Sequence, residues 1–321
     1  MQKACSKCGT GFEITQSDLD FYDKVSPMFG GKKCMIPPPK LCPDCRLQRR
    51  VAWRNERFMY KRKCDATGKD IISMYPPDSP FKIYEQSVWW SDSWNALDYG
   101  RDFDFNRPFF EQFRELQLEV PRLALVNKNS HNSQYTNHAG DNKDCYLSAT
   151  IFESEDIYYS DWVIDHCRDL VDCSYVMEGC ELCYEIYYGW GSYQAFFSEF
   201  TKRCQNIWFC YDCMNCKHCF LCSNLRNKEY CFENNQLTKE EYEKKIKSLL
   251  PWSHSNLKEY KTKYIKMKEG QAVHPAIYQV QSLDSSGDLL FQTENCQHCF
   301  DIIGSKDCRY CQSVIDVKDC L

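Results

Sequence analysis

The stretch Cys204-Gln-Asn-Ile-Trp-Phe-Cys210, with Cys216-Lys-His-Cys-Phe-Leu-Cys222 twelve residues later, decides the fold, because one seven-residue pattern occurs in it twice. Eight copies of the pattern align without gaps at steps of eleven to thirteen residues. The copies begin at Asn142, Ser154, Cys167, Gly179, Ser192, Cys204, Cys216 and Asn227. A fixed short period is the signature of a repeat architecture, and short β-rich units predict a β-solenoid.

When the eight copies are aligned, each position of the pattern forms a column that contains similar residue types. Positions one and seven are mostly Ser, Cys, Asn or Gly, which suits a narrow interior, whereas position four is mostly apolar, as in Ile157, Leu170 and Ile207. Another apolar column follows three residues after each copy. A flat strand alternates every two residues, so columns three apart predict a coil with frequent bends. We prefer about twelve residues a turn; a coil twice as long is the alternative.

The run Cys210, Cys213, Cys216, Cys219 and Cys222 has a spacing that would also suit an iron–sulfur or multi-metal site. Each of these cysteines occupies a column that elsewhere holds Ser, Ile, Val or Leu, which a ligand column could not tolerate. Free cysteine packs as a small hydrophobe. We therefore favour a packing role, with a second metal in the Cys210–Cys222 run as the alternative.

A different pattern of cysteines opens the chain, with Cys5-Ser-Lys-Cys8 and Cys42-Pro-Asp-Cys45 forming two closely spaced pairs. Thiolates three residues apart on a tight turn can hold one Zn²⁺, and four of them close a tetrahedral site. The predicted cofactor is one structural Zn²⁺ on Cys5, Cys8, Cys42 and Cys45, and four unligated cysteines are the alternative.

These pairs, with Gly9 after the first and Leu41 before the second, resemble the bacterial "probable zinc-ribbon" segment over about residues 4–57. The resemblance implies the same four ligands and no activity. The segment from Gly30 to Cys34 lengthens the loop, so Cys34 is either a competing ligand or, as we expect, a free thiol. The chain as a whole is similar to uncharacterised cysteine-rich zinc-ribbon proteins of uncultured small-genome bacteria.

Charge is distributed unevenly along the chain. The net charge of −5 divides into +8 over residues 1–63 and −13 over the remaining 258. Any affinity for RNA or DNA is therefore expected at the N-terminal basic segment, which we expect to form a helix after Cys45. The candidate contacts are Arg46, Arg49, Arg50, Arg54, Arg57, Lys61, Arg62 and Lys63. The alternative is a basic helix docked on the acidic remainder of the chain.

Position five of the copies contains an aromatic stripe that could form a protein partner surface on the solenoid face. Its aromatic members are Tyr146, Tyr158, Phe196, Trp208 and Phe220. We favour the alternative that the helical segment following the repeats covers this stripe.

The chain divides into five expected segments. They are a zinc ribbon with the start of the basic helix (1–57), an aromatic-rich α/β connector (58–126), cysteine-rich repeats (127–235), a helical insertion (236–286) and resumed repeats (287–321). Cys64 in the connector is expected to be buried. The last repeat is expected to be truncated, so that a protein partner could also bind its uncapped C-terminal end.

Several functions have no support in the sequence. A secretory signal and a membrane-length apolar run are both missing, so we expect a cytoplasmic protein with reduced thiols and no membrane partner. No phosphate loop, nucleophile elbow or zinc-protease motif occurs, and we lean toward a protein that is not an enzyme.

We therefore predict a mainly β fold with helical segments, in which an N-terminal zinc ribbon is followed by a short-period β-solenoid interrupted by a helical insertion. The predicted function is that of a non-enzymatic zinc-binding scaffold or interaction protein. A nucleic-acid-binding protein and a metal-cluster or redox protein are the alternatives.

Overall fold

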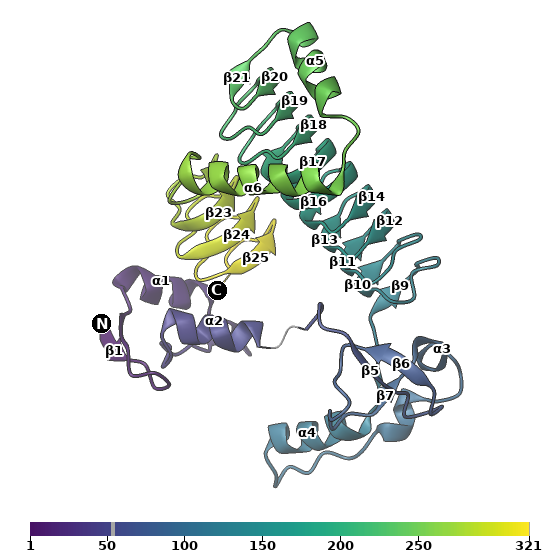
Figure 1. Ribbon diagram of the computed structural model, residues 1–321. Coiled ribbons are helices and arrows are strands. Elements are labelled where there is room, and N and C mark those ends of the chain that lie inside the picture. The colour runs from purple at the N-terminus through teal and green to yellow at the C-terminus, as the bar shows by residue number, and fades with distance from the viewer. Residues whose placement is uncertain (53–54, 321) are drawn as a thin grey trace. The chain divides into compact units, whose positions relative to one another are not determined.

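The computed structural model describes residues 1–52 and 55–320 (Figure 1). Strands contain 35% of the residues and helices 21%, so the fold is mainly β. The chain forms two compact units, which we describe separately. The terminal unit comprises Met1–Arg54 and His274–Leu321, and the central unit comprises Asn55–Val273.

A 13-stranded sheet, here called the parallel stack, forms most of the central unit. Its strands are parallel except for the last, which turns back on β20. They are β9 (Asn127–Lys128), β10 (Asn137–Gly140), β11 (Ala149–Phe152), β12 (Glu155–Tyr158), β13 (Asp161–Ile164), β14 (Arg168–Val171), β15 (Ser174–Met177), β16 (Glu181–Trp190), β17 (Tyr193–Lys202), β18 (Gln205–Trp208), β19 (Lys217–Phe220), β20 (Glu229–Phe232) and β21 (Asn235–Gln236).

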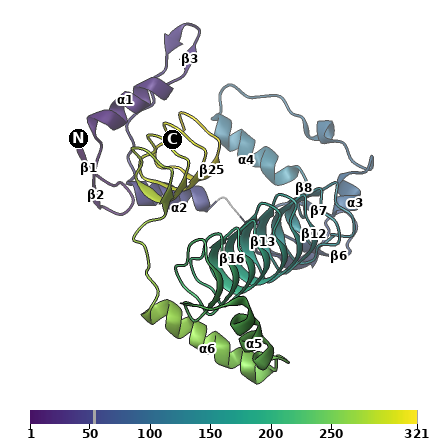
Figure 2. The same ribbon diagram turned by 90° about the horizontal axis from the view of Figure 1, so that it is seen from above.

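The parallel pairing has a short, constant register. Tyr193 pairs with Gln205 and Gln205 with Lys217, a step of twelve residues, and Glu155 pairs with Arg168, a step of thirteen. Each layer of the stack, here called a rung, therefore corresponds to about twelve residues. This is the length that we preferred from the column spacing, rather than twenty-four. Figure 2 shows successive rungs of the stack one behind another.

The predicted alignment is one residue out in two of the eight copies. Arg168 pairs with Glu181, so the fourth copy begins at Cys180 rather than Gly179. Similarly, Lys217 pairs with Glu229, so the last copy begins one residue after Asn227. Small residues occupy both candidate positions at 179 and 180, so composition could not separate the two registers. Because inward positions are three residues apart, a slip of one residue moves each of them onto a neighbour, so that Cys183 is buried and Leu182 is exposed.

Bends recur every three residues along each rung. In the rung that begins at Tyr193, the residues with left-handed backbone are Gln194, Phe197, Phe200 and Arg203, with φ between 51° and 54°. Each precedes an inward side chain that is at most 2% exposed, namely Ala195, Ser198, Thr201 and Cys204. Left-handed backbone is uncommon outside glycine. Four such bends a rung explain why the inward columns are three residues apart.

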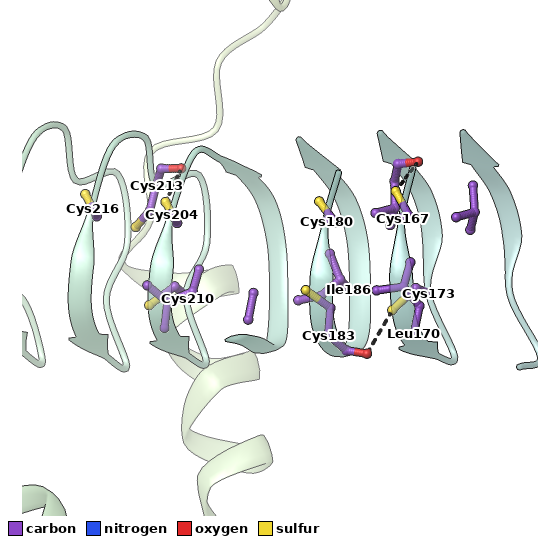
Figure 3. Close-up of a cluster of buried hydrophobic side chains, with 14 of the residues drawn as sticks. Cys167, Leu170, Cys173, Cys180, Cys183, Ile186, Cys204, Cys210, Cys213 and Cys216 are labelled. Atoms are coloured by element: carbon purple, nitrogen blue, oxygen red, sulfur yellow. Dashed lines mark hydrogen bonds between the residues drawn. The ribbon is translucent and has the colours of Figure 1, made fainter. Parts of the chain in front are cut away.

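Small hydrogen-bonding side chains occupy the inward side of these bends. The Ser198 hydroxyl donates to the Phe196 carbonyl (2.8 Å) and accepts the Cys210 N–H of the next rung (2.9 Å). The Cys210 thiol donates in the same way to the Trp208 carbonyl (3.4 Å). Because buried backbone groups need partners, Ser and Cys can exchange in these columns. Figure 3 shows such cysteine side chains inside the stack.

Two helices cover one face of the parallel stack (Figure 1). Helix α5 (Lys239–Leu249) begins with a capping box formed by Thr238 and Glu241, and α6 (His254–Gly270) follows. Tyr242 of α5 and Tyr264 of α6 pack in one cluster with Phe220 of the stack. The apolar surface buried in this cluster holds both helices against the sheet.

The rest of the central unit precedes the stack. It contains the hairpin β5 (Tyr60–Lys63) and β6 (Asp70–Ser73), the parallel pair β7 (Ile83–Tyr84) and β8 (Arg122–Leu123), α3 (Gln86–Trp89), a 3₁₀ turn (Ala96–Tyr99) and α4 (Phe109–Glu119). The aromatic side chains around α4 contact one another but stay exposed to solvent. They are Phe103, Phe105, Phe109, Phe110 and Phe113.

The terminal unit joins the two ends of the chain. Its first part contains β1 (Gln2–Ala4), β2 (Gly11–Glu13), α1 (Gln16–Val25), β3 (Met28–Phe29), β4 (Lys32–Lys33) and α2 (Pro43–Val51). Its second part is a parallel sheet of β22 (Gln279–Val280), β23 (Gly287–Phe291), β24 (Cys299–Ile303) and β25 (Gln312–Ile315). Leu290 pairs with Ile302 and Ile302 with Val314, which again is a step of twelve residues.

A buried ion pair connects the two parts of the terminal unit. Arg309 donates to Asp18 of α1 at 2.7 Å, and the two side chains are 13% and 6% exposed. Arg46 of α2 lies over the Tyr310 ring, and Arg50 donates to the Tyr310 carbonyl (2.7 Å). Both views show α1 and α2 beside β25 (Figures 1 and 2). The helices α1 and α2 therefore dock on the C-terminal parallel sheet β22–β25.

We predict that Arg309→Met destabilises the terminal unit by about 3 kcal/mol at pH 7, because it leaves the Asp18 carboxylate buried without its cation. Burial raises the pKa of Asp18, but hydrogen bonds from Thr15 and the Arg309 cation outweigh it and lower the pKa below 3.8. A lowered carboxyl pKa adds stability above the unfolded-state pKa that is lost as pH falls, so the difference between wild type and variant should shrink below about pH 4. Hydrogen-exchange rates of the backbone amides in α1 and β25 measure this loss of stability. An unchanged exchange rate at pH 7 would contradict the role of the pair.

We predict that Cys213→Ala lowers the free energy of unfolding of the central unit by about 1 kcal/mol, because it removes one buried sulfur atom from the core. Cys213 is 1% exposed and its thiol donates to the Tyr211 carbonyl at 3.5 Å. Metal content should not change. Urea unfolding and metal analysis check both statements, and a loss of bound metal in this variant would support the metal-cluster alternative instead.

Candidate metal centre

The four N-terminal cysteines come from two local structures. Cys5 and Cys8 lie in the turn between β1 and β2, where Cys5 N–H donates to the Thr10 carbonyl and Gly9 N–H to the Cys5 carbonyl, both at 2.9 Å. Gly9 has φ of 76°, which glycine adopts without steric cost. Cys42 is the N-cap residue of α2, and Cys45 lies in its first turn.

The two local structures bring four sulfur atoms together. Their Sγ atoms all lie within 4.8 Å of one another, and those of Cys8 and Cys42 are 3.8 Å apart. Tetrahedral zinc with Zn–S bonds of about 2.3 Å places its sulfurs about 3.8 Å apart. The arrangement therefore has the size of a four-thiolate metal site. It fits a metal ion such as zinc, and all four positions of a tetrahedron would be taken by protein ligands.

The surroundings give the four thiols different acidities. Backbone N–H groups, that of Cys42 foremost, lower the pKa of Cys5 to about 6. The hydroxyl and backbone of Thr10 lower the pKa of Cys8. Burial and then the neighbouring thiols raise the pKa of Cys45 to about 12. At neutral pH the site therefore offers the thiolate of Cys5. Because neighbouring thiolates repel one another, a cation bound among them would stabilise their charged form.

The other N-terminal and connector cysteines lie outside this group. Cys34 follows the β3–β4 hairpin, in which Gly30 and Gly31 both have positive φ, as a two-residue type I′ turn requires. Its side chain is exposed, and it does not belong to the four-sulfur group. Cys64 is buried in the central unit, as expected from the sequence.

Among the described residues, the N-terminal cysteines are the one group whose ligand atoms all lie within 4.8 Å of one another, and the Cys210–Cys222 run does not form such a group. All five cysteines are buried. Burial raises the pKa of Cys210, whereas hydrogen bonds with the thiols of Cys210 and Cys219 lower the pKa of Cys222. Buried thiols that donate to carbonyl groups are consistent with the packing role.

The basic segment does not form one continuous helix. Helix α2 ends at Val51, and Lys61, Arg62 and Lys63 lie on strand β5 of the other unit. The predicted helix is therefore wrong beyond α2, because the chain passes there from one compact unit into the next. Arg54 lies outside the described residues, so its predicted role has no structural counterpart.

Most of the described basic side chains have partners within their own unit. The partners are the Tyr22 hydroxyl for Arg46, the Tyr310 carbonyl for Arg50, Asp161 for Arg57, Asp65 for Arg62 and Asp70 for Lys63. Arg49 and Lys61 are exposed to solvent. The seven predicted contacts that the structure describes are therefore divided between the two units, and no single unit contains them all.

The aromatic stripe is divided by the covering helices. Phe220 is fully buried beneath them, and Phe196 and Trp208 are half-buried, with Trp208 stacked on Trp252 at 5.3 Å. The interpretation that we favoured, in which the helical segment covers the stripe, therefore holds for these three residues, and they offer no partner surface. Tyr146 and Tyr158 lie at earlier rungs and are 40% and 36% exposed.

Sequence reasoning missed the residues that attach the metal module to the last repeats, chiefly Asp18 and Arg309. They are 291 residues apart in the chain, and no local pattern marks the pair. The capping box formed by Thr15 and Asp18 could have predicted the start of α1 from the sequence. Nothing in that motif indicates that Asp18 pairs with Arg309.

Comparison with protein-family models, with curated proteins and with solved structures finds no match for this chain. Within the described residues, no helix has the length and apolar character needed to cross a membrane.

Proposed function

We propose that this protein is a non-enzymatic zinc-binding scaffold or interaction protein. The observation that carries the proposal is the group of four cysteine sulfurs within 4.8 Å of one another. In this proposal the N-terminal module is a zinc ribbon, as its resemblance to that family implies. Four thiolates leave zinc no open position for substrate or water, so the metal would be structural.

The scaffold part of the proposal concerns the two parallel sheets, which we infer to be segments of β-solenoid. A register of twelve residues, four bends a rung and inward columns of small or apolar side chains all support it. The buried cysteines are free thiols, which suits a reducing compartment and the expected cytoplasmic location.

Exposed aromatic side chains support binding to a protein partner. Phe103, Phe105, Phe109 and Phe110 form a run of ring contacts around the start of α4, with centroids 4.9 to 6.2 Å apart. Phe105 is 90% and Phe110 is 80% exposed. A contiguous, exposed apolar patch of this kind commonly marks a site of protein–protein interaction.

The two alternatives have less support. A nucleic-acid-binding protein needs free cations on one surface, whereas most of the basic side chains have partners in the chain. A metal-cluster protein needs a second ligand group, and the described residues hold only the N-terminal one.

We predict that the purified protein contains one zinc and no iron. Cys42→Ser should weaken zinc binding by more than tenfold because it removes one of four thiolates. Cys34→Ser is the matched control, since it removes an exposed thiol of the same module, and it should leave the affinity unchanged. Metal analysis and competition with a chromogenic chelator measure these values. Equal loss in both variants, or iron with labile sulfide, would contradict the proposal.

We further predict that a strong chelator unfolds the N-terminal part of the terminal unit, because structural zinc contributes on the order of 10 kcal/mol to so small a module. Hydrogen exchange should accelerate at least 100-fold in β1, β2 and the first turn of α2. The rungs of the parallel stack should keep their protection, since their core contains no metal. Uniform acceleration in both units, or none in either, would contradict the prediction.

A further inference from the structure

The hairpin β5–β6 repeats the hairpin β1–β2 at an offset of 59 residues. Lys3 pairs with Phe12 in the first hairpin, and Arg62 pairs with Ile71 in the second. The other two pairs of β1–β2 recur at the same offset in β5–β6. The two hairpins therefore have identical strand register, although one belongs to the terminal unit and the other to the central unit.

The turns of the two hairpins also match bond for bond. Cys64 N–H donates to the Lys69 carbonyl at 2.9 Å and Gly68 N–H to the Cys64 carbonyl at 2.8 Å, as Cys5 and Gly9 do in the first hairpin. Gly68 has φ of 71°, against 76° for Gly9. Cys64 therefore occupies the place of Cys5, and Thr67 occupies that of Cys8.

A helix start faces each turn in the same way. The Ser6 N–H donates to the Lys40 carbonyl at 3.0 Å, and the Asp65 N–H donates to the Ile83 carbonyl at 2.9 Å. Two residues beyond each of these carbonyls comes the N-cap of a helix. The N-cap residues are Cys42, with φ −64° and ψ 163°, and Glu85, with φ −61° and ψ 155°.

The same correspondence extends to the sulfur atom. The Glu85 N–H donates to the Cys64 Sγ at 3.3 Å, as the Cys42 backbone does to the Cys5 sulfur. The helices continue alike, because Arg46 N–H donates to the Cys42 carbonyl and Trp89 N–H to the Glu85 carbonyl. Glu85 thus stands at the place of Cys42.

We infer that residues 60–89 are a second copy of the four-cysteine module and contain a latent metal site. Its four ligand positions are Cys64, Thr67, Glu85 and Val88. Cys64 keeps its thiol, and the other three positions have changed.

Hydrogen bonds replace the metal in this copy. The Thr67 hydroxyl donates to the Glu85 carboxylate at 3.0 Å, which joins two of the former ligand positions directly. Lys69 lies 3.7 Å from the same carboxylate. Val88 supplies an apolar side chain where a fourth thiolate would stand. The central unit can therefore hold this fold without a metal, whereas the terminal unit keeps all four thiols.

The test restores the missing thiols in the full-length chain. The triple variant Thr67→Cys, Glu85→Cys, Val88→Cys should bind one zinc more than the wild type, and with Co²⁺ it should add a second set of thiolate charge-transfer bands. The control Lys69→Cys, Glu85→Cys, Val88→Cys also adds three cysteines but misplaces one of them, and it should gain no tightly bound metal. Adding Cys64→Ser to the triple variant should weaken the new site at least tenfold.

The readout is the difference from wild type, so it is independent of the zinc proposed for the terminal unit. A wild type without zinc and a triple variant with one would overturn the proposed function and support the second copy. A folded triple variant with no additional metal would overturn the second copy. If the triple variant does not fold even with zinc, the double variant Thr67→Cys, Glu85→Cys decides: Co²⁺–thiolate bands absent from wild type support the site, and their absence overturns it.

Discussion

The bend that recurs every three residues is the constraint on which the rest of this structure depends. At such bends, backbone N–H and carbonyl groups need partners inside the parallel stack, and a side chain as short as Ser198 or Cys210 can supply them. This requirement explains the cysteine content better than apolar packing alone. A thiol is small enough for the interior, donates to the carbonyl two residues earlier as serine does, and also packs as a hydrophobe.

The metal module uses cysteine for a different reason, and its position in the fold gives it a wider role. Four sulfurs from a turn and a helix start lie within 4.8 Å of one another, so a metal ion bound there would hold the two together. The helices that follow, α1 and α2, dock on the last repeats through Asp18, Arg46 and Arg50. A structural metal at one end of the chain would therefore stabilise the repeats at the other end. The central unit contains an arrangement with the same backbone but with only one of the four thiols, that of Cys64, which indicates that hydrogen bonds as well as a metal can stabilise this backbone.

The predictions from the sequence succeeded where the signal was local. Cys5 and Cys8 share a turn, so their spacing alone indicates a pair of ligands, and the twelve-residue step follows from columns within neighbouring copies. The one-residue slip at Gly179 has a physical cause, because glycine and cysteine fit equally well on the inside of a bend. The basic helix failed for another reason. A run of cations without helix breakers cannot reveal that the chain passes into a separate compact unit after α2. The five expected segment boundaries and the zinc-ribbon resemblance stay predictions.

The amino-acid sequence by itself determined the four-cysteine set, the twelve-residue step and the helical insertion after residue 236, because each is encoded by residues close together in the chain. Only the tertiary structure decided that Phe220 is covered while Tyr146 is exposed, that Arg309 meets Asp18, and that Glu85 stands opposite Cys64. Those outcomes depend on contacts between segments 21 to 291 residues apart. Spacing within one segment carries no information about such contacts, so folding alone establishes them.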